Sequence, residues 1–226
     1  MTRETFHEEL EKTELELLSL GELAGTAVQR AIEALVQHDD AKAQEVIDGD
    51  DEIDDLYLKI DSGVLQMLAL QSPVALDLRL ISAILHCDLH LERIGDQAVN
   101  VAKLYLATRD ARGSEPMRQQ IEEMGTHVVT MVRTSMEAFG RRDLDLALKV
   151  PVMDDPVDRL NRTTHLEALK LADDPSQLDW GLHMNMAARA LERVGDNAVD
   201  IAEQVGFLLT GEFREFTDAS HPVSME

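Results

Sequence analysis

Acidic side chains recur at intervals of four residues in two short segments of this chain, LERIGDQAVNVA (Leu91–Ala102) and LERVGDNAVDIA (Leu191–Ala202). Residues four apart on an α-helix differ by about 40° around its axis, so each segment presents one stripe of oxygen-bearing side chains. Clustered carboxylates are hard ligands suited to magnesium, manganese, calcium or iron. The candidate metal ligands are Glu92, Asp96 and Asn100 in the first stripe and Glu192, Asp196 and Asp200 in the second.

The stripes also have an explanation that needs no metal. Arg93 lies three residues before Asp96, and Arg193 three before Asp196, so local pairing and ordinary solvation could make each stripe a wet helix face. Like charges four apart destabilise a helix by about 0.2–0.5 kcal/mol per pair, a cost that a bound cation would offset. Spacing alone leaves both explanations open.

A second source of carboxylates lies on the helix expected before each motif. If the two helices pack antiparallel, these acids meet the stripe across the groove between them. Because the apolar residues of the motif helix fall on its other side, we expect the stripe at the edge of the bundle or outside it. Asp88 extends only the first stripe, where the second has Ala188, and His86 and His90 beside it could assist a metal. The acids on the preceding helices are Asp50, Asp51, Asp54 and Asp55 in the first half and Asp154, Asp155 and Asp158 in the second.

The elements that must position these residues are long helices. Apolar residues make up 44% of the chain, yet aromatic residues only 4%, which favours helices over strands. The expected N-cap is Asp39, and Pro73 breaks the pattern because proline fits the first turn of a helix but not its interior. The helices that apolar spacing predicts for the first half cover residues 5–37, 41–70 and 74–109.

The second half repeats this plan. Eight of twelve motif positions are identical between the segments that begin at Leu91 and Leu191, and Asp143 and Pro175 fall in the places of the first cap and break. Such self-similarity indicates a duplicated unit. We therefore predict an all-α protein with two tandem, similar antiparallel three-helix bundles, packed end to end or side by side, with one continuous six-helix bundle as the alternative. The predicted domains cover residues 1–110 and 116–211, and residues 212–226 form a flexible tail.

Charge and cysteine content narrow the class of function. The 21 Lys and Arg residues stand against 44 Asp and Glu, for a net charge of −23, which disfavours nucleic acid and anionic lipid as partners. The single cysteine, Cys87, excludes an internal disulfide and suggests a reducing compartment. We find no apolar run long enough to span a membrane and no secretory pattern in residues 1–20, so we expect a cytoplasmic protein without membrane insertion. Neither motif holds a nucleophile with an adjacent base, so we expect no catalytic residues.

The two motifs resemble the signature of the PhoU family. AIEALVQHDDAKAQEVIDGDDEID and PVALDLRLI, which precede the first motif, are similar to that family too, and the resemblance covers roughly residues 5–210. It implies two similar three-helix bundles and a protein without enzymatic activity. In the family, some members bind iron, zinc or other metals at the E-x-x-x-D motifs. The resemblance also matches family acids on the preceding helices to Asp51, Asp54, Asp155 and Asp158.

The function that this resemblance implies is negative regulation of phosphate uptake and of the phosphate-starvation response. Family members act between a phosphate ABC transporter, through its ATPase subunit, and the sensor histidine kinase of a two-component system. Dimers are common in the family, so a homodimer is expected. The bound metal implied here is iron, zinc, manganese or magnesium. The rival hypotheses are a carboxylate-bridged metalloenzyme acting on phosphoesters and a purely structural dimerising bundle.

Overall fold

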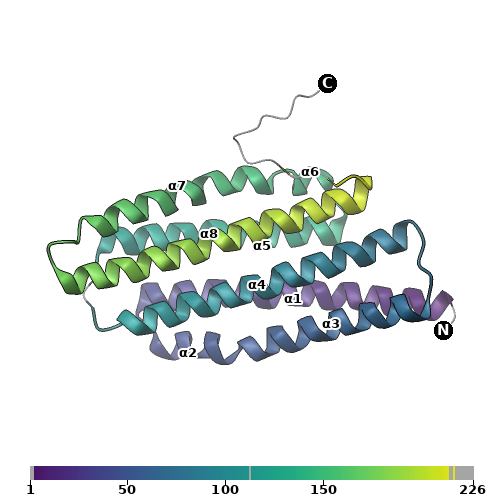
Figure 1. Cartoon of the computed structure of the whole chain (residues 1–226), viewed down its shortest axis with the longest axis horizontal. Coiled ribbons are helices and arrows are strands. Elements are labelled where there is room, and N and C mark those ends of the chain that lie inside the picture. Colours follow the sequence, from purple (N-terminus) through teal and green to yellow (C-terminus); the bar gives the residue numbers. More distant parts are fainter. Residues whose placement is uncertain (1–2, 112, 214–215, 217–226) are drawn as a thin grey trace, which may run out of the picture.

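The computed structural model describes residues 3–111, 113–213 and 216, and in this part of the chain all regular structure is helical (Figure 1). The first half forms a three-helix bundle in which α2 and α3 together make the middle helix, and the second half repeats it with α6 and α7. The predicted all-α class with two antiparallel three-helix bundles is confirmed. The helices are α1 (Arg3–Gln37), α2 (Asp40–Asp48), α3 (Asp50–Leu70), α4 (Leu76–Thr108), α5 (Glu115–Arg141), α6 (Leu144–Ala147), α7 (Val150–Leu169) and α8 (Pro175–Thr210).

Acidic caps begin equivalent helices in the two halves, as the sequence predicts. The Asp39 carboxylate accepts a hydrogen bond from the backbone N–H of Lys42 at 2.9 Å, and Asp143 accepts one from Leu146 at 2.9 Å. Asp174 caps α8 in the same way, with a proline in the first turn behind it. Each cap satisfies a backbone donor that the first turn of a helix leaves unpaired.

The prediction of one continuous helix over residues 41–70 was wrong. The helix is interrupted at Gly49, whose flexible backbone is costly to hold in a helix interior, and the chain resumes as α3 at Asp50. The second half is also interrupted, between α6 and α7, but earlier in the repeat, because at the offset of 104 Gly49 aligns with Met153 inside α7. There Pro151, which has no backbone N–H, occupies the first turn of α7.

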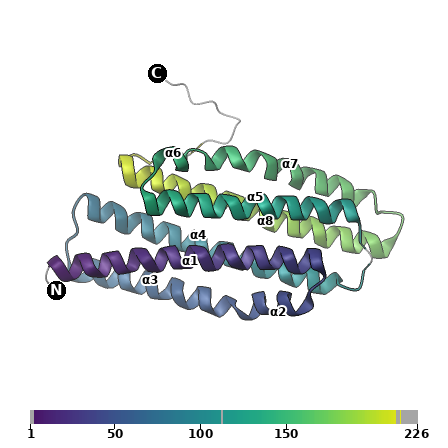
Figure 2. The same ribbon diagram turned by 180° about the vertical axis from the view of Figure 1, so that it is seen from behind.

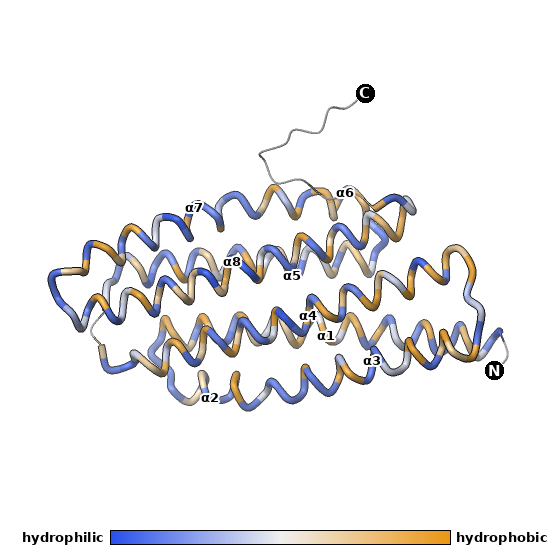
Figure 3. The backbone as a smooth tube through the Cα atoms, viewed as in Figure 1, coloured by the Kyte–Doolittle hydropathy of each residue, from blue (hydrophilic) through white to orange (hydrophobic). Residues whose placement is uncertain are grey.

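The two bundles lie side by side, which settles the alternative that the sequence left open. Figures 1 and 2 show α4 running antiparallel along α8 on one side, and α1 antiparallel along α5 on the other. The side chain of Arg133 on α5 donates to Gln29 on α1 at 2.8 Å. Figure 3 shows hydrophobic residues alternating with hydrophilic ones along the helices, the pattern of amphipathic helices packed around cores.

Glycines allow α1 and α5 to approach each other closely, and they do so twice with the same geometry. A methyl group at Gly21 would lie 2.8 Å from Met136 Cγ, and one at Gly125 would lie 2.3 Å from Ile32 Cδ1. Gly125 stands 104 positions after Gly21, and Met136 stands 104 after Ile32, so the two contacts are copies of one another. The repeats are therefore related by an approximate twofold rotation.

The predicted domain boundaries stay predictions. The second predicted domain begins at residue 116, whereas α5 begins at Glu115 with Pro116 in its first turn, a place that proline fits. Most of the predicted tail, residues 212–226, lies outside the described residues. Among the described helices, none combines the length and apolar composition needed to cross a membrane.

Candidate functional site

In the first bundle, acids on α3 face the stripe on α4. Burial raises the pKa of Glu92, and the charges of Asp96 and Asp54 raise it further. Burial likewise raises the pKa of Asp50, followed by the charges of Asp54 and Asp96. Because these effects act across the groove between two helices, α3 and α4 bring their carboxylates together as the antiparallel arrangement predicts.

The second bundle holds the equivalent group between α7 and α8. Burial raises the pKa of Asp154 to about 7, with further increases from the charges of Asp158, Asp196 and Glu192. Burial also raises the pKa of Asp196, and the charges of Asp158 and Asp200 add to it. Like charges held this close raise each other's pKa, and a bound cation would relieve the repulsion.

Two oxygen atoms of this second group are buried without a hydrogen-bond partner: Asp154 Oδ1 and Glu192 Oε2. The other carboxylate oxygen of Glu192 contacts Arg189 Nη1. A buried acceptor without a partner costs free energy, so such atoms mark a place where a further group completes the site. The residues present therefore fit a hard cation.

The glycine of each motif explains why the two groups differ. A methyl group at Gly195 would lie 2.6 Å from Asp154 Oδ1, so the bare glycine backbone is what admits that carboxylate against α8. A methyl group at Gly95 would instead meet Ile53 Cδ1 at 2.9 Å. The same glycine therefore packs against an acid in the second bundle and against an apolar side chain in the first.

The predicted placement of the stripe was wrong at two residues. Asp88 is only 1% exposed and Glu192 only 9%, although both were expected at the bundle edge or outside it. Burial raises the pKa of both carboxyl groups, and a charge on the preceding helix adds to it, that of Asp61 on α3 for Asp88 and that of Asp158 on α7 for Glu192. Of the remaining acids of the two stripes, Asp96 and Asp196 are exposed, and Glu92 and Asp200 are half-buried.

Asp50 and Asp154 are the acids that sequence reasoning undervalued. They were noted as acids of the preceding helices, but Asp51 and Asp155 were chosen as ligands. The chosen pair is exposed and contributes the smallest of the charge effects on its neighbours. Their spacing in the sequence could have identified them. Asp50 lies four residues before Asp54, and Asp154 four before Asp158, so each two acids share one face of their helix.

The histidines beside Asp88 do not point to the first stripe. His86 Nδ1 lies 2.7 Å from the carbonyl oxygen of Ser82 on its own helix. His90 Nδ1 reaches across the interface between the bundles, 2.9 Å from Asn197 Oδ1 and 3.3 Å from Asp200 Oδ2. His90 thus belongs to the neighbourhood of the second stripe.

The spacing of the motif residues suggested ion pairs within each helix, between Arg93 and Asp96 and between Arg193 and Asp196. Within the described ranges, neither ion pair is formed. Nor do three His, Cys, Asp or Glu side chains of the described part already stand in an arrangement that could hold a metal ion. Ligation would therefore require the carboxylates to turn toward a common point.

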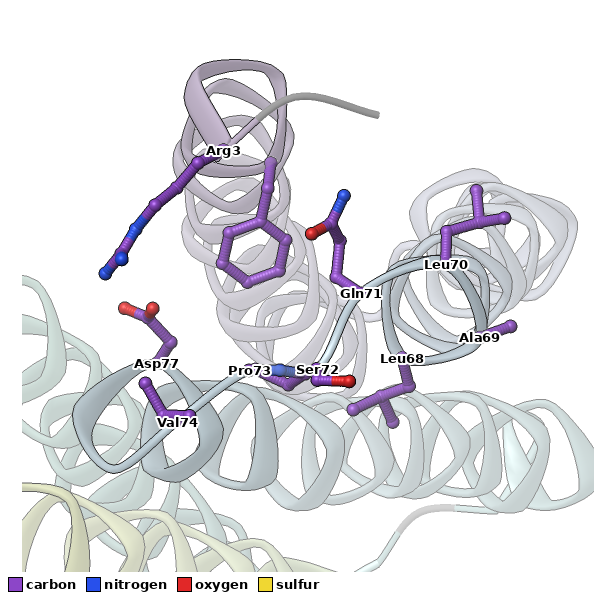
Figure 4. A pocket seen from close by; sticks show the side chains of 10 residues that line it. Arg3, Leu68, Ala69, Leu70, Gln71, Ser72, Pro73, Val74 and Asp77 are labelled. Carbon is purple, nitrogen blue, oxygen red and sulfur yellow. The ribbon is translucent and has the colours of Figure 1, made fainter.

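A hollow of about 610 Å³ lies at the turn between α3 and α4, and its lining includes no residue of either motif. Figure 4 shows Arg3 and Asp77 pointing toward one another across it, with Pro73 and Val74 at its base. Ala75, in the same turn, has φ 44°, a backbone conformation that residues with a side chain rarely adopt. Its lining offers one carboxylate and no cluster of metal ligands.

Comparison with known proteins agrees with this architecture. A model of the PhoU domain matches the chain twice, over residues 17–105 and 121–205. A phosphate-specific transport system accessory protein PhoU homolog from Pseudomonas aeruginosa is 37% identical over 217 residues, which cover 96% of this chain and 88% of the relative. The name of this relative describes an accessory protein of phosphate transport.

Two solved structures share the fold. The crystal structure of PhoU from Pseudomonas aeruginosa has a TM-score of 0.87 at 37% identity, covering 92% of this chain and 100% of the other. The phosphate transport system regulatory protein PhoU from Streptococcus pneumoniae has a TM-score of 0.85 at 27% identity, covering 92% and 99%. With both repeats matched over most of their length, the chain belongs to the PhoU family, a family of non-enzymatic accessory proteins.

Proposed function

We propose that this protein is a negative regulator of phosphate uptake and of phosphate-starvation signalling. The observation that carries the proposal is the twofold match to the PhoU domain, together with relatives named as accessory and regulatory proteins of phosphate transport. It works as a cytoplasmic, non-catalytic adaptor between the ATPase subunit of a phosphate ABC transporter and a sensor histidine kinase.

The charge of the molecule supports docking on basic partner surfaces. A net charge of −23 speeds association with a basic patch and makes it weaken as salt rises. Deletion of the gene, followed by a phosphate-responsive reporter at high phosphate, tests the regulatory role. The reporter should lose repression and regain it with the wild-type chain, whereas unchanged repression after deletion would contradict the proposal.

We further propose that each acidic group binds a hard divalent or trivalent cation. The buried, unpartnered oxygens of Asp154 and Glu192 support this, as does the repeated convergence of acids across two helix pairs. A cation would supply positive charge that neutralises the carboxylates and ties α3 to α4 and α7 to α8. The ligands predicted from the sequence are Glu92, Asp96, Asn100, Asp51 and Asp54 in one bundle and Glu192, Asp196, Asp200, Asp155 and Asp158 in the other, with Asp50 and Asp154 added by the structure.

Metal content per chain tests this second proposal directly. Protein purified without chelator or affinity-tag metal is analysed for its elements, alongside Asp96→Asn and Asp196→Asn variants. Each variant should lose the cation of one bundle only. Glu8→Gln, which changes an exposed acid far along α1, serves as the control and should retain the wild-type content. Equal metal content in all four proteins would contradict the assignment.

A further inference from the structure

A groove of about 510 Å³ runs between the C-terminal half of α4 and the N-terminal half of α8. Three of its lining residues are the cations Lys103, Arg189 and Arg193, and none of the lining residues that the structure describes is an Asp or Glu. This composition is unusual in a chain with twice as many acids as bases. The groove is therefore a local positive region on an acidic molecule.

The basic side chains of the groove have N–H groups available to a bound anion. Within the described residues, neither Lys103 nor Arg193 lies within 4 Å of a carboxylate as an ion pair. Arg189 contacts Glu192 through Nη1 only, and a guanidinium carries five N–H donors in all. The amide side chains of Gln97 and Asn100 line the same groove and supply further N–H groups.

The duplication provides an internal comparison. Because α4 and α8 run antiparallel and the motifs are offset by 100, the seam has a second end built from equivalent positions. There Glu203 stands in the place of Lys103, and Asp200 in the place of Asn100. At that end the Asp200 carboxylate lies 3.3 Å from His90 Nδ1. The positive character is thus a property of these particular side chains and not of the fold.

We propose that the groove between α4 and α8 is an oxyanion-binding site that takes inorganic orthophosphate. Lysine and arginine are the residues that bind phosphate oxygens most strongly, and the planar guanidinium can donate two parallel hydrogen bonds to one anion. The oxyanion site rests on the groove alone. The choice of orthophosphate over the phosphate group of a larger molecule rests on the proposed function.

The site borders the candidate metal centres. Burial raises the pKa of Asp50, Glu192 and Asp196, and the charge of Lys103 opposes this rise at Asp50, as that of Arg193 does at Glu192 and Asp196. The cations of the groove therefore lie near acids of both candidate metal centres. A metal cation bound by the acids would neutralise their negative charge. The basic side chains of the groove would then attract an incoming anion more strongly.

Isothermal titration calorimetry with orthophosphate, at constant ionic strength, tests the assignment. The full-length protein is first treated with chelator, because removing metal excludes phosphate that is bound through a cation. Arg193→Ala and Lys103→Ala should each weaken binding about tenfold, the effect of removing one charge-assisted contact. Arg93→Ala, the equivalent position in the other repeat, is the matched control and should bind as the wild type does. Arg193→Lys, which keeps the charge, should retain part of the affinity.

Parallel titrations with sulfate and with adenosine monophosphate identify the ligand. Saturable orthophosphate binding that depends on Arg193 but not on Arg93 supports the proposal. Binding of adenosine monophosphate without orthophosphate would overturn the choice of ligand, and equal binding by all variants, or none, would overturn the site. The assay contains neither transporter nor kinase, so a negative result leaves the regulatory role to its own reporter test.

Discussion

Replacing Asp88 with asparagine should stabilise the protein at and above neutral pH. The Asp88 side chain is 1% exposed, and its Oδ2 has no hydrogen-bond partner. Burial raises the pKa of this carboxyl group from its ordinary 3.8 to about 7, against the effect of a hydrogen bond from the Leu89 backbone. Asparagine has nearly the same shape and carries no charge to bury.

The sign and size of the effect follow from proton linkage. Between pH 4 and pH 7 the unfolded chain has lost the Asp88 proton while the folded chain keeps it, so the free energy of unfolding falls as pH rises, and it levels off above pH 7. A rise of the pKa from 3.8 to about 7 corresponds to about 4 kcal/mol at most, and about 2 kcal/mol after local relaxation. Asp88→Asn removes this loss, so its advantage over the wild type should grow across that range.

Urea unfolding of both proteins at pH 4.5, 6 and 8, with chelator present, measures the difference. Asp55→Asn, an exposed acid on α3, is the control and should change stability by less than about 0.5 kcal/mol at every pH. An advantage for Asp88→Asn that does not change with pH would refute the reasoning. A variant less stable than the wild type at pH 8 would show that the ionised carboxylate has a partner in solution.

Five further substitutions probe the packing of the helices and the sites. Gly25→Ala should stabilise the protein by about 0.5–1 kcal/mol in thermal unfolding, because the new methyl group meets only Val132 Cγ1 at 3.7 Å. Gly125→Ala should destabilise it by about 1–3 kcal/mol, because its methyl group would lie 2.3 Å from Ile32 Cδ1. Gly195→Ala should displace the Asp154 carboxylate and weaken cation binding by the second bundle about tenfold in equilibrium dialysis. Gly95→Ala, which meets Ile53 instead, should leave cation binding by the first bundle unchanged; equal losses in both would contradict this view of the motif glycines. Tyr105→Phe should cost about 0.5–1.5 kcal/mol of unfolding free energy, since the Tyr105 hydroxyl donates to Asp40 Oδ1 at 2.7 Å, and no change would show that water replaces this bond at no cost.

The fold could be predicted from the sequence because its signals are local. Apolar spacing defines the helices, and the caps at Asp39 and Asp143 act within one helical turn. The interruption at Gly49 was missed because an isolated glycine is tolerated inside many helices, and only packing decides whether the helix continues. The side-by-side arrangement depends on contacts more than 100 residues apart, such as that of Gly21 with Met136, which no local pattern encodes.

The candidate site was predictable in part for the same reason. Spacing along α4 and α8 places the motif acids on one stripe, but burial depends on what the neighbouring helix contributes. Glu192 was expected at the edge of the bundle or outside it, but it is buried, and Asp158 on the neighbouring α7 lies near enough for its charge to raise the pKa that burial already raises. The choice between Asp50 and Asp51 turns on the rotation of α3 about its own axis, which apolar spacing fixes only loosely.

Identical motifs therefore do not imply identical sites. Both repeats present a glycine at the same place, yet Ile53 covers one and the Asp154 carboxylate covers the other. The first repeat adds a buried acid at Asp88 where the second has alanine. A duplicated backbone keeps its helices and its close contacts because these depend on small residues at fixed places. The charges along the shared seam are free of that constraint, so one end of the α4–α8 seam became acidic and the other basic, and a symmetric fold came to carry two chemically distinct surfaces.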